Sequence, residues 1–189
     1  MFLIFDTETT GLPKNYKGLP SDLQNWPRVV QLAWQLYDGE GSLVKQEDFI
    51  IYPEGYTIPL EASRIHGVTT ERALQEGILL KEALIMFSED VKKSKNIIAH
   101  NLSFDEPVIH AEFIRCELLF PFGDSIRTCT MLTTTEYCAI KTDRGFKWPA
   151  LKELHKKLFD SEFSGAHDAK VDVAMCAKCF FELKRRSVL

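Results

Sequence analysis

The spacing of apolar and polar positions predicts strands in the first part of the chain. Residues 2–6 (FLIFD) form a short apolar run without alternation, which is typical of a strand buried on both faces. Residues 29–38 and 42–53 predict two more strands, joined by the turn-forming residues 39–41 (GEG). Residues 13–27 hold three prolines and several other turn formers, which predicts a long loop before the second strand.

Further along, helical spacing of apolar positions alternates with short apolar runs. Residues 59–93 predict helix in several pieces, with KEALIMFSEDVKK the clearest amphipathic stretch. Ser103 and Glu106 are spaced like a capping box for a helix over 103–118, although Pro107 conflicts with that start. The other expected elements are strands at 96–99 and 125–131 and helices at 150–158 and 168–186.

This order of elements predicts one α/β domain over residues 1–189. The early strands follow one another through short connections, which favours antiparallel pairing, whereas helices separate the later strands, which favours parallel pairing. We therefore expect a mixed sheet with helices packed on it. The length suffices for a substantial core, and 45% hydrophobic and 26% charged residues are ordinary for a globular protein.

Composition and charge narrow the location and the partners. No apolar run approaches the ~18 residues of a membrane span, and Asp6 and Glu8 interrupt the first apolar run too early for a signal peptide. Five cysteines, an odd number, do not suggest a disulfide framework. We therefore expect a cytoplasmic protein without a membrane partner. The net charge of −4 argues against a broad basic surface for duplex DNA, but not against an enzyme that holds a few nucleotides.

Two acids follow directly on the first apolar run. Asp6 and Glu8 are two residues apart, so on a strand both carboxylates project from the same face. Close carboxylates repel each other unless a cation lies between them, and Mg²⁺ and Mn²⁺ prefer such oxygen ligands. An isolated D-x-E stretch is more often a solvated turn. The buried strand in front of it favours a site instead, because ligand sites of open α/β sheets lie at strand ends.

Three further residues have matching chemistry. Asp105 follows the expected strand at 96–99, and His167 and Asp172 stand at the start of the last helix. Each segment alone is better explained as a helix start, with Asp168 as the cap of the last helix. Together, four carboxylates and one histidine could hold two divalent ions and supply a general base, which are the functions that phosphodiester cleavage needs.

Three motifs carry a specific resemblance. FDTETTGLP, HNLSFD and HDAKVD, in this order, resemble the exonuclease motifs of the DEDDh family of 3′→5′ exonucleases. SRIHGVT and the DTETTGL form are most similar to the branches that contain the epsilon proofreading subunit of bacterial DNA polymerase III and the Trex enzymes. The resemblance covers residues 2 to about 183. It implies a ribonuclease H-like α/β fold, with a central mixed five-stranded sheet flanked by helices.

The resemblance also implies roles for the five site residues. Asp6 would bridge two divalent cations, Mg²⁺ or Mn²⁺. Glu8 and Asp172 would hold the cation that carries the attacking water, and Asp105 would serve the second cation. His167 would be the general base that takes the proton of the water.

Contacts to the terminal nucleotide follow from the same motifs. Phe104 would stack on a base, which tolerates any sequence, and Leu12 would pack against one. His66 would touch the nucleotide, although a histidine that caps a turn is an equally good explanation. The complete expected set is Thr7, Thr9, Gly11, Leu12, His66, Asn101 and Phe104.

The expected function is a metal-dependent 3′→5′ exonuclease that releases nucleoside 5′-monophosphates from DNA. Its expected partners are the 3′ end of single-stranded DNA and a DNA polymerase or repair complex. An exoribonuclease of the RNase T or oligoribonuclease type stays open, because no residue reports on the 2′-hydroxyl. An aspartyl-nucleophile phosphatase is less compatible, since Glu8 stands where its D-x-D motif has Asp. A binder without activity would gain nothing from four converging carboxylates.

Other conspicuous residues are expected to be structural. Cys176 and Cys179 form C-x-x-C without a second ligand pair, so core packing is favoured over a zinc site. Trp26 and Trp34 are expected in the core. Residues 148–151 (WPAL) are expected to start a helix, with a proline near its first position.

Overall fold

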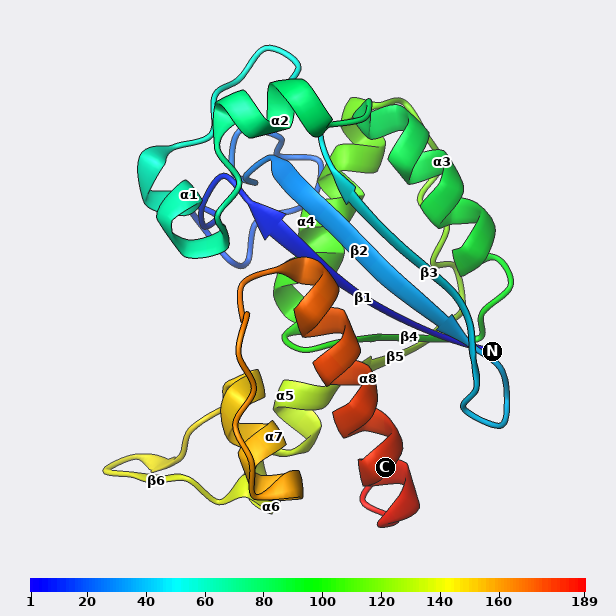
Figure 1. Ribbon diagram of the computed structural model, residues 1–189, viewed down its shortest axis with the longest axis vertical. Helices are drawn as coiled ribbons and strands as arrows, with labels where there is room; N and C mark the ends of the chain where they lie inside the picture. The colour runs from blue at the N-terminus through cyan, green and yellow to red at the C-terminus, as the bar shows by residue number, and fades with distance from the viewer.

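Five strands form the central sheet of this protein, which the computed structural model describes over residues 1–189 (Figure 1). Their order in space is β3-β2-β1-β4-β5, with β1, β2 and β3 antiparallel and with β4 and β5 parallel to β1. The expected mixed five-stranded sheet is therefore confirmed. The bounds are β1 (Phe2–Thr9), β2 (Val29–Tyr37), β3 (Leu43–Ile50), β4 (Asn96–Ala99) and β5 (Ile126–Cys129).

Helices cover both faces of this sheet. α3 and α4 pack on one face, and α7 and α8 pack on the other, while α1 and α2 lie near the end of β1 (Figure 1). No helix combines the length and the apolar character needed to cross a membrane. The helices are α1 (Leu60–His66), α2 (Thr70–Glu76), α3 (Leu80–Val91), α4 (Leu102–Arg115), α5 (Thr130–Thr133), α6 (Thr135–Cys138), α7 (Leu151–Phe159) and α8 (Ala169–Arg185).

The central strand β1 explains the apolar run at the start of the chain. Leu3 and Phe5 belong to the core between the sheet and α3 and α4. Ile4, one residue out of phase, belongs to the core under α7 and α8. Successive side chains of a strand point to opposite faces, so a strand between two helical layers is apolar at every position. The expectation of burial on both faces is confirmed.

Strand β1 is longer than expected. It continues through Asp6 and Glu8 to Thr9, because this polar end still pairs with β2, with Asp6 opposite Ala33 and Glu8 opposite Gln31. The two acids therefore lie within a strand rather than in a turn after it. A strand is the more rigid support, since its backbone is held by the sheet.

The expected capping box at the start of α4 is wrong. The helix begins at Leu102, and its N-cap is Asn101, whose φ of 77° is left-handed. The Ser103 hydroxyl donates to the Asn101 side chain, and Glu106 forms an ion pair with Arg127. Both residues that would form the box are thus engaged elsewhere.

The segment between β5 and α7 contains elements that the sequence did not predict. These are the four-residue helices α5 and α6 and a hairpin of β6 (Lys141–Thr142) and β7 (Gly145–Phe146). Elements this short contain too few residues to show a hydrophobic period. The expected structural roles of Trp26 and Trp34, and of Cys176 and Cys179 in α8, are confirmed, since all four are buried in the core.

Candidate active site

A cavity of about 510 Å³ opens where β1, α4, α8 and the segment before α7 meet. All five residues predicted as catalytic line it, although they come from three regions distant in sequence. Thr7, Asn101 and Phe104 line it as well. These five residues are Asp6, Glu8, Asp105, His167 and Asp172.

Asp105 is held in the cavity by the same strand that supplies the first two acids. Its Oδ1 accepts a hydrogen bond of 2.7 Å from the Thr7 hydroxyl and one of 3.1 Å from the Thr7 N–H. Thr7 points to the opposite face from Asp6 and Glu8, toward α4, as the alternation of a strand requires. The side chain of Thr7 therefore fixes an acid of the site, in addition to lining the cavity.

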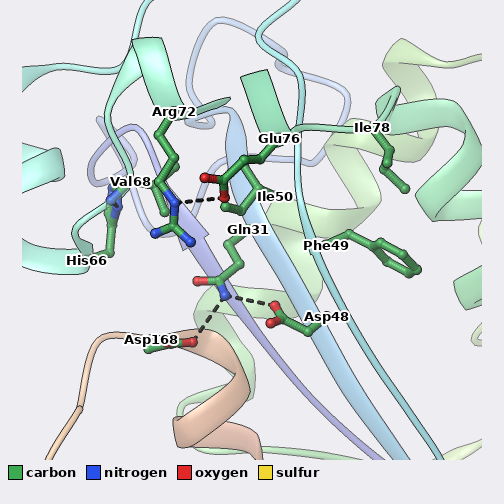
Figure 2. A pocket seen from close by; sticks show the side chains of 10 residues that line it. All are labelled: Gln31, Asp48, Phe49, Ile50, His66, Val68, Arg72, Glu76, Ile78 and Asp168. Carbon is green, nitrogen blue, oxygen red and sulfur yellow. Dashed lines mark hydrogen bonds and ion pairs between the residues drawn. The ribbon is translucent and has the colours of Figure 1, made fainter. Parts of the chain in front are cut away.

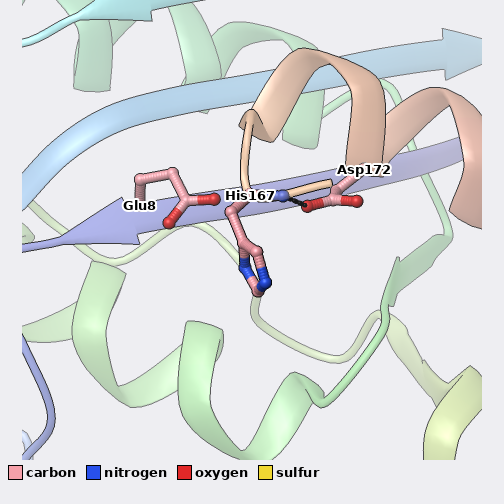
Figure 3. A group of neighbouring side chains, drawn as sticks. All are labelled: Glu8, His167 and Asp172. Carbon is pink, nitrogen blue, oxygen red and sulfur yellow. Dashed lines mark hydrogen bonds between the residues drawn. The ribbon is translucent and has the colours of Figure 1, made fainter. Parts of the chain in front are cut away.

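Glu8, His167 and Asp172 form the tightest group of possible metal ligands (Figure 3). One ligand atom of each lies within 4.8 Å of those of the other two. His167 has a left-handed φ of 68°, and its backbone N–H donates to Asp172 Oδ2 at 2.7 Å. This bond fixes the loop before α8, while the exposed imidazole of His167 forms no hydrogen bond within the chain.

The site concentrates negative charge that no ion pair neutralises. None of its four carboxylates takes part in an ion pair. Burial, reinforced by repulsion from Asp105 and Glu8, raises the pKa of Asp6 well above its usual range. Burial likewise raises the pKa of Glu8 to about 8 and that of Asp105 to about 7, despite the hydrogen bonds from Thr7. Oxygen ligands that repel each other in this way fit divalent cations such as Mg²⁺ or Mn²⁺.

The start of α8 is positioned by Gln31 of β2 (Figure 2). The Gln31 Nε2 donates to Asp168 Oδ1 at 3.1 Å and to Asp48 Oδ1 at 2.8 Å, and its Oε1 accepts from the Ala169 N–H at 3.2 Å. Asp168 is also the N-cap of α8, as expected. A buried glutamine thus ties the sheet to the turn that carries His167. The sequence reading missed it because its pattern marks it only as one position of a strand.

Four residues expected to contact the nucleotide lie outside the lining of this cavity. The Thr9 hydroxyl donates to the Gly11 carbonyl at 2.6 Å within a local turn, and the Leu12 side chain is 72% exposed. His66 is buried and lines a second cavity, of about 250 Å³ (Figure 2). Its Nδ1 accepts from the Val68 N–H at 3.1 Å, which is the turn-capping contact. The role of these four residues in substrate binding stays a prediction.

The opposite wall of the cavity includes residues that the sequence did not identify. Lys147, Trp148 and Lys152 line it, and Trp148 is 64% exposed. The helix expected to start within residues 148–151 is confirmed, since α7 begins at Leu151 with Ala150 as its N-cap, but Pro149 lies before the cap rather than near the first helical position. Trp148 therefore lies before the helix and outside the core.

His100 anchors this wall. Its Nδ1 lies 3.0 Å from the Thr130 hydroxyl and its Nε2 lies 3.0 Å from the Pro149 carbonyl. Burial lowers the pKa of His100 to about 4, so the ring is neutral at pH 7 and serves as a hydrogen-bonded link. The signal that could have identified it is its place as the first residue of the HNLSFD motif.

A mixed sheet of this topology, with carboxylates converging at the end of its central strand, defines the ribonuclease H-like class of α/β proteins. Within that class, the chain belongs to the RNase T exonuclease family, whose model matches residues 3–180. The expected resemblance to exonucleases is thereby confirmed at the level of the family.

Individual relatives agree with this assignment. DNA polymerase III subunit epsilon of Treponema pallidum (strain Nichols) is 27% identical over 116 residues, 61% of this chain and 47% of that protein. E. coli Exonuclease I in complex with a dT13 oligonucleotide matches with a TM-score of 0.78 at 24% identity, over 98% of this chain and 41% of that one. The zinc ion bound form of the E. coli ExoI–ssDNA complex matches with a TM-score of 0.75 at 25% identity, over 98% of this chain and 40% of that one. The chain spans less than half the length of these relatives, and the structural likeness confirms the fold.

Proposed function

We propose that this protein is a 3′→5′ exonuclease that releases nucleoside 5′-monophosphates from single-stranded DNA. The observation that carries the proposal is the convergence of four unpaired carboxylates and one unbonded imidazole in a single open cavity. A buried acid without a counter-charge destabilises a fold, so a set of four is retained for a chemical reason. Membership of an exonuclease family supports phosphodiester hydrolysis as that reason.

The motif resemblance supplies the assignment of the cation ligands, and all four acids line the cavity. Asp6 would serve both of two divalent cations. Glu8 and Asp172 would hold the first with it, and Asp105 would serve the second. When bound, two such cations activate a water and stabilise the leaving oxygen of a phosphodiester. The Thr7 hydroxyl keeps Asp105 oriented for this task.

His167 is the proposed general base. Its imidazole is exposed beside Glu8 and Asp172, and its backbone is fixed through the hydrogen bond to Asp172. A histidine with a free ring nitrogen at the site of the attacking water can take the proton of that water. The residue has left-handed backbone and lines the cavity.

The substrate assignment rests on the relatives and on the lining of the cavity. Structures of Exonuclease I carry dT13 and dA16 oligonucleotides, and another relative is a DNA polymerase subunit. Phe104 offers a ring on which any base can stack. We therefore place the 3′-terminal nucleotide between Phe104 and the acids, and we propose a DNA polymerase or repair complex as the setting of the reaction.

The test is mononucleotide release with Mg²⁺ or Mn²⁺ from matched single-stranded DNA, single-stranded RNA and a 3′-mismatched duplex. Asp6→Ala should lower the rate at least about 10³-fold, and His167→Ala about 10²-fold or more. Asp124→Ala, at an exposed acid outside the cavity, is the matched control and should retain full activity. Full activity of the Asp6 or His167 variant would show that the assignment of the site residues is wrong. Faster cleavage of RNA than of DNA would show that RNA is the substrate.

A further inference from the structure

One surface next to the cavity is not used by the proposed chemistry. Residues 141–148 are exposed at every position, and the β6–β7 hairpin they contain projects beyond the rest of the molecule (Figure 1). The stretch leads directly into the cavity wall at Lys147 and Trp148. It therefore connects the site to a protruding arm.

Trp148 is held in its exposed position by fixed backbone on both sides. Before it, the Lys147 N–H donates to the Ile140 carbonyl at 3.0 Å. After it, His100 Nε2 contacts the Pro149 carbonyl at 3.0 Å. An indole that a fixed backbone keeps in water, at the rim of a cavity, offers a preformed surface for another ring. Stacking of a nucleobase would remove this apolar surface from water.

The charge of the hairpin is opposite to that of the molecule. The chain carries a net charge of −4, whereas residues 141–148 contain three cations and a single acid, Asp143. Lys141 and Arg144 form no ion pair, so their charges are available to an anionic partner. Cations spaced along an arm beside an exposed aromatic ring match a chain of alternating phosphates and bases.

We propose that Trp148 and the β6–β7 hairpin form a binding track for single-stranded nucleic acid. A base upstream of the 3′-terminal nucleotide stacks on Trp148, and the preceding phosphates lie along Arg144 and Lys141. A duplex does not fit this track, because its bases are already stacked in the helix and offer no free face. The orientation of the strand rests on the proposed function, but the track binds whether or not hydrolysis occurs.

The first test uses tryptophan fluorescence, because Trp26 and Trp34 are buried and Trp148 alone is exposed. Titration with the oligonucleotide dT8 in EDTA, where no metal-dependent hydrolysis occurs, should quench the wild type. Trp148→Ala should abolish the quenching and weaken the binding of labelled dT8 about tenfold, whereas Trp148→Phe should retain most of the affinity. A fully paired duplex should quench little.

The second test removes the cations. Each phosphate contact on a single strand contributes a slope of about −0.7 to a plot of log K against log salt. For the double variant Lys141→Ser/Arg144→Ser, the slope of this plot for dT8 should therefore be shallower by about 1.4 than for the wild type. Binding of dT2, which is too short to reach the hairpin, should stay the same. The matched control is Lys81→Ser/Lys92→Ser, at an exposed lysine of the distant α3 and at the exposed lysine that caps its C-terminus, which should leave the dT8 slope unchanged.

The outcomes separate this inference from the proposed function. If wild type degrades dT8 but all variants bind it as wild type does, with unchanged quenching and slope, the track is refuted and the exonuclease stands. If wild type shows the quenching and the variants lose it, but no nucleic acid is hydrolysed, the track stands and the exonuclease is refuted. Absence of any effect of dT8 on Trp148 would point to a protein contact on the hairpin instead and would overturn the inference.

Discussion

Buried carboxylates occur in two regions of this molecule, and their surroundings differ. Asp90 and Glu112 lie on the side of the sheet covered by α3 and α4, and both are completely buried. Asp105, in the candidate site, is almost as deeply buried, at 2% exposure. In the first region every carboxylate is paired with cations, and in the second none is.

Asp90 illustrates full compensation. Its oxygens accept hydrogen bonds from Lys45 and Lys93 at 2.8 Å each and from the Trp34 indole at 3.0 Å. Burial alone would raise the pKa of Asp90, but these donors outweigh it and lower the pKa below its usual value. The acid joins α3 to β2 and β3 and remains charged.

Glu112 has the same function for the long loop before β2. It forms ion pairs with Arg28 at 3.0 Å and with Arg115 at 3.2 Å. Arg115 in turn donates to three loop carbonyls, those of Leu23, Trp26 and Pro27. The loop is thus fixed to α4 through a buried charge that the protein itself neutralises.

The comparison shows how structural acids can be distinguished from the acids of the candidate site. Where the protein supplies the counter-charge, a buried carboxylate contributes to folding. Where it supplies none, as at Asp6 and Asp105, the pKa rises and the folded state is less stable until a cation binds. Burial and sequence alone do not separate the two cases, but the presence of partners does.

The largest expected effect comes from removing one acid of each kind. Glu112→Ala leaves two arginines at a buried site without their acid, and should lower the free energy of unfolding by about 3–5 kcal/mol. Asp6→Ala removes a repelling charge and should leave the metal-free stability unchanged or higher, while abolishing activity. Urea unfolding of both variants in EDTA measures this difference. Equal destabilisation of the two variants would mean that the acids of the two regions do not differ in their contribution to folding.

A smaller effect concerns pH and metal. The pKa of Glu8 is about 8 in the folded state, whereas its ordinary value is 4.5. Folding is therefore coupled to the uptake of a proton at pH values between these two. Metal-free stability should therefore decrease as pH rises from about 4.5 to 8. At pH 8, Mg²⁺ at 100 times its Kd should raise the free energy of unfolding by about 2.7 kcal/mol. At pH 5 protons compete with Mg²⁺ for the carboxylates, so the same concentration should raise it by less.

Thermal unfolding at both pH values, with EDTA or Mg²⁺, measures this coupling. Glu8→Gln carries no titrating group at this position and should flatten the metal-free pH dependence. A stability that rises between pH 5 and 8 without metal would contradict the uncompensated site. Glu112→Gln is unsuitable as a control, because it disrupts a structural pair, so Asp124→Asn at the surface is used instead.

The features that could be predicted from the sequence are those that a local pattern of residues determines. The unbroken apolar run of β1 predicts a central strand, and the two-residue spacing of Asp6 and Glu8 predicts a shared face. Both are confirmed by the structure. The convergence of Asp105, His167 and Asp172 on the same point depended on combining weak signals with motif resemblance, since each alone is typical of a helix start.

What could not be predicted depends on contacts between distant segments. Nothing in the local sequence distinguishes Gln31 from any polar strand residue, because its partners come from β3 and from the start of α8. Trp148 was expected to be structural because it precedes a helix start, but it is 64% exposed, and the contacts that fix the backbone on either side of it come from His100 and Ile140. Such contacts appear only once the chain is folded.

The smallest expected effect tests whether the protein's own hydrogen bonds position the uncompensated acids. Gln31→Met keeps the volume of the side chain but removes its bonds to Asp168 and to the Ala169 N–H. We expect a loss of about 1–2 kcal/mol in stability and an about tenfold lower kcat with little change in KM, because the turn that carries His167 is less well placed.

The matched control for this prediction lies four residues along the same strand. Gln35 is equally buried and forms two side-chain hydrogen bonds, to Gln46 and Tyr37, against three for Gln31, but it has no hydrogen bond to the start of α8. Gln35→Met should therefore cost similar stability and leave kcat unchanged. A parallel loss of kcat in both variants would mean that the rate follows global stability. A loss in the Gln31 variant alone means that β2 positions the turn that carries His167 through a single amide, since no other side-chain hydrogen bond joins β2 to the start of α8.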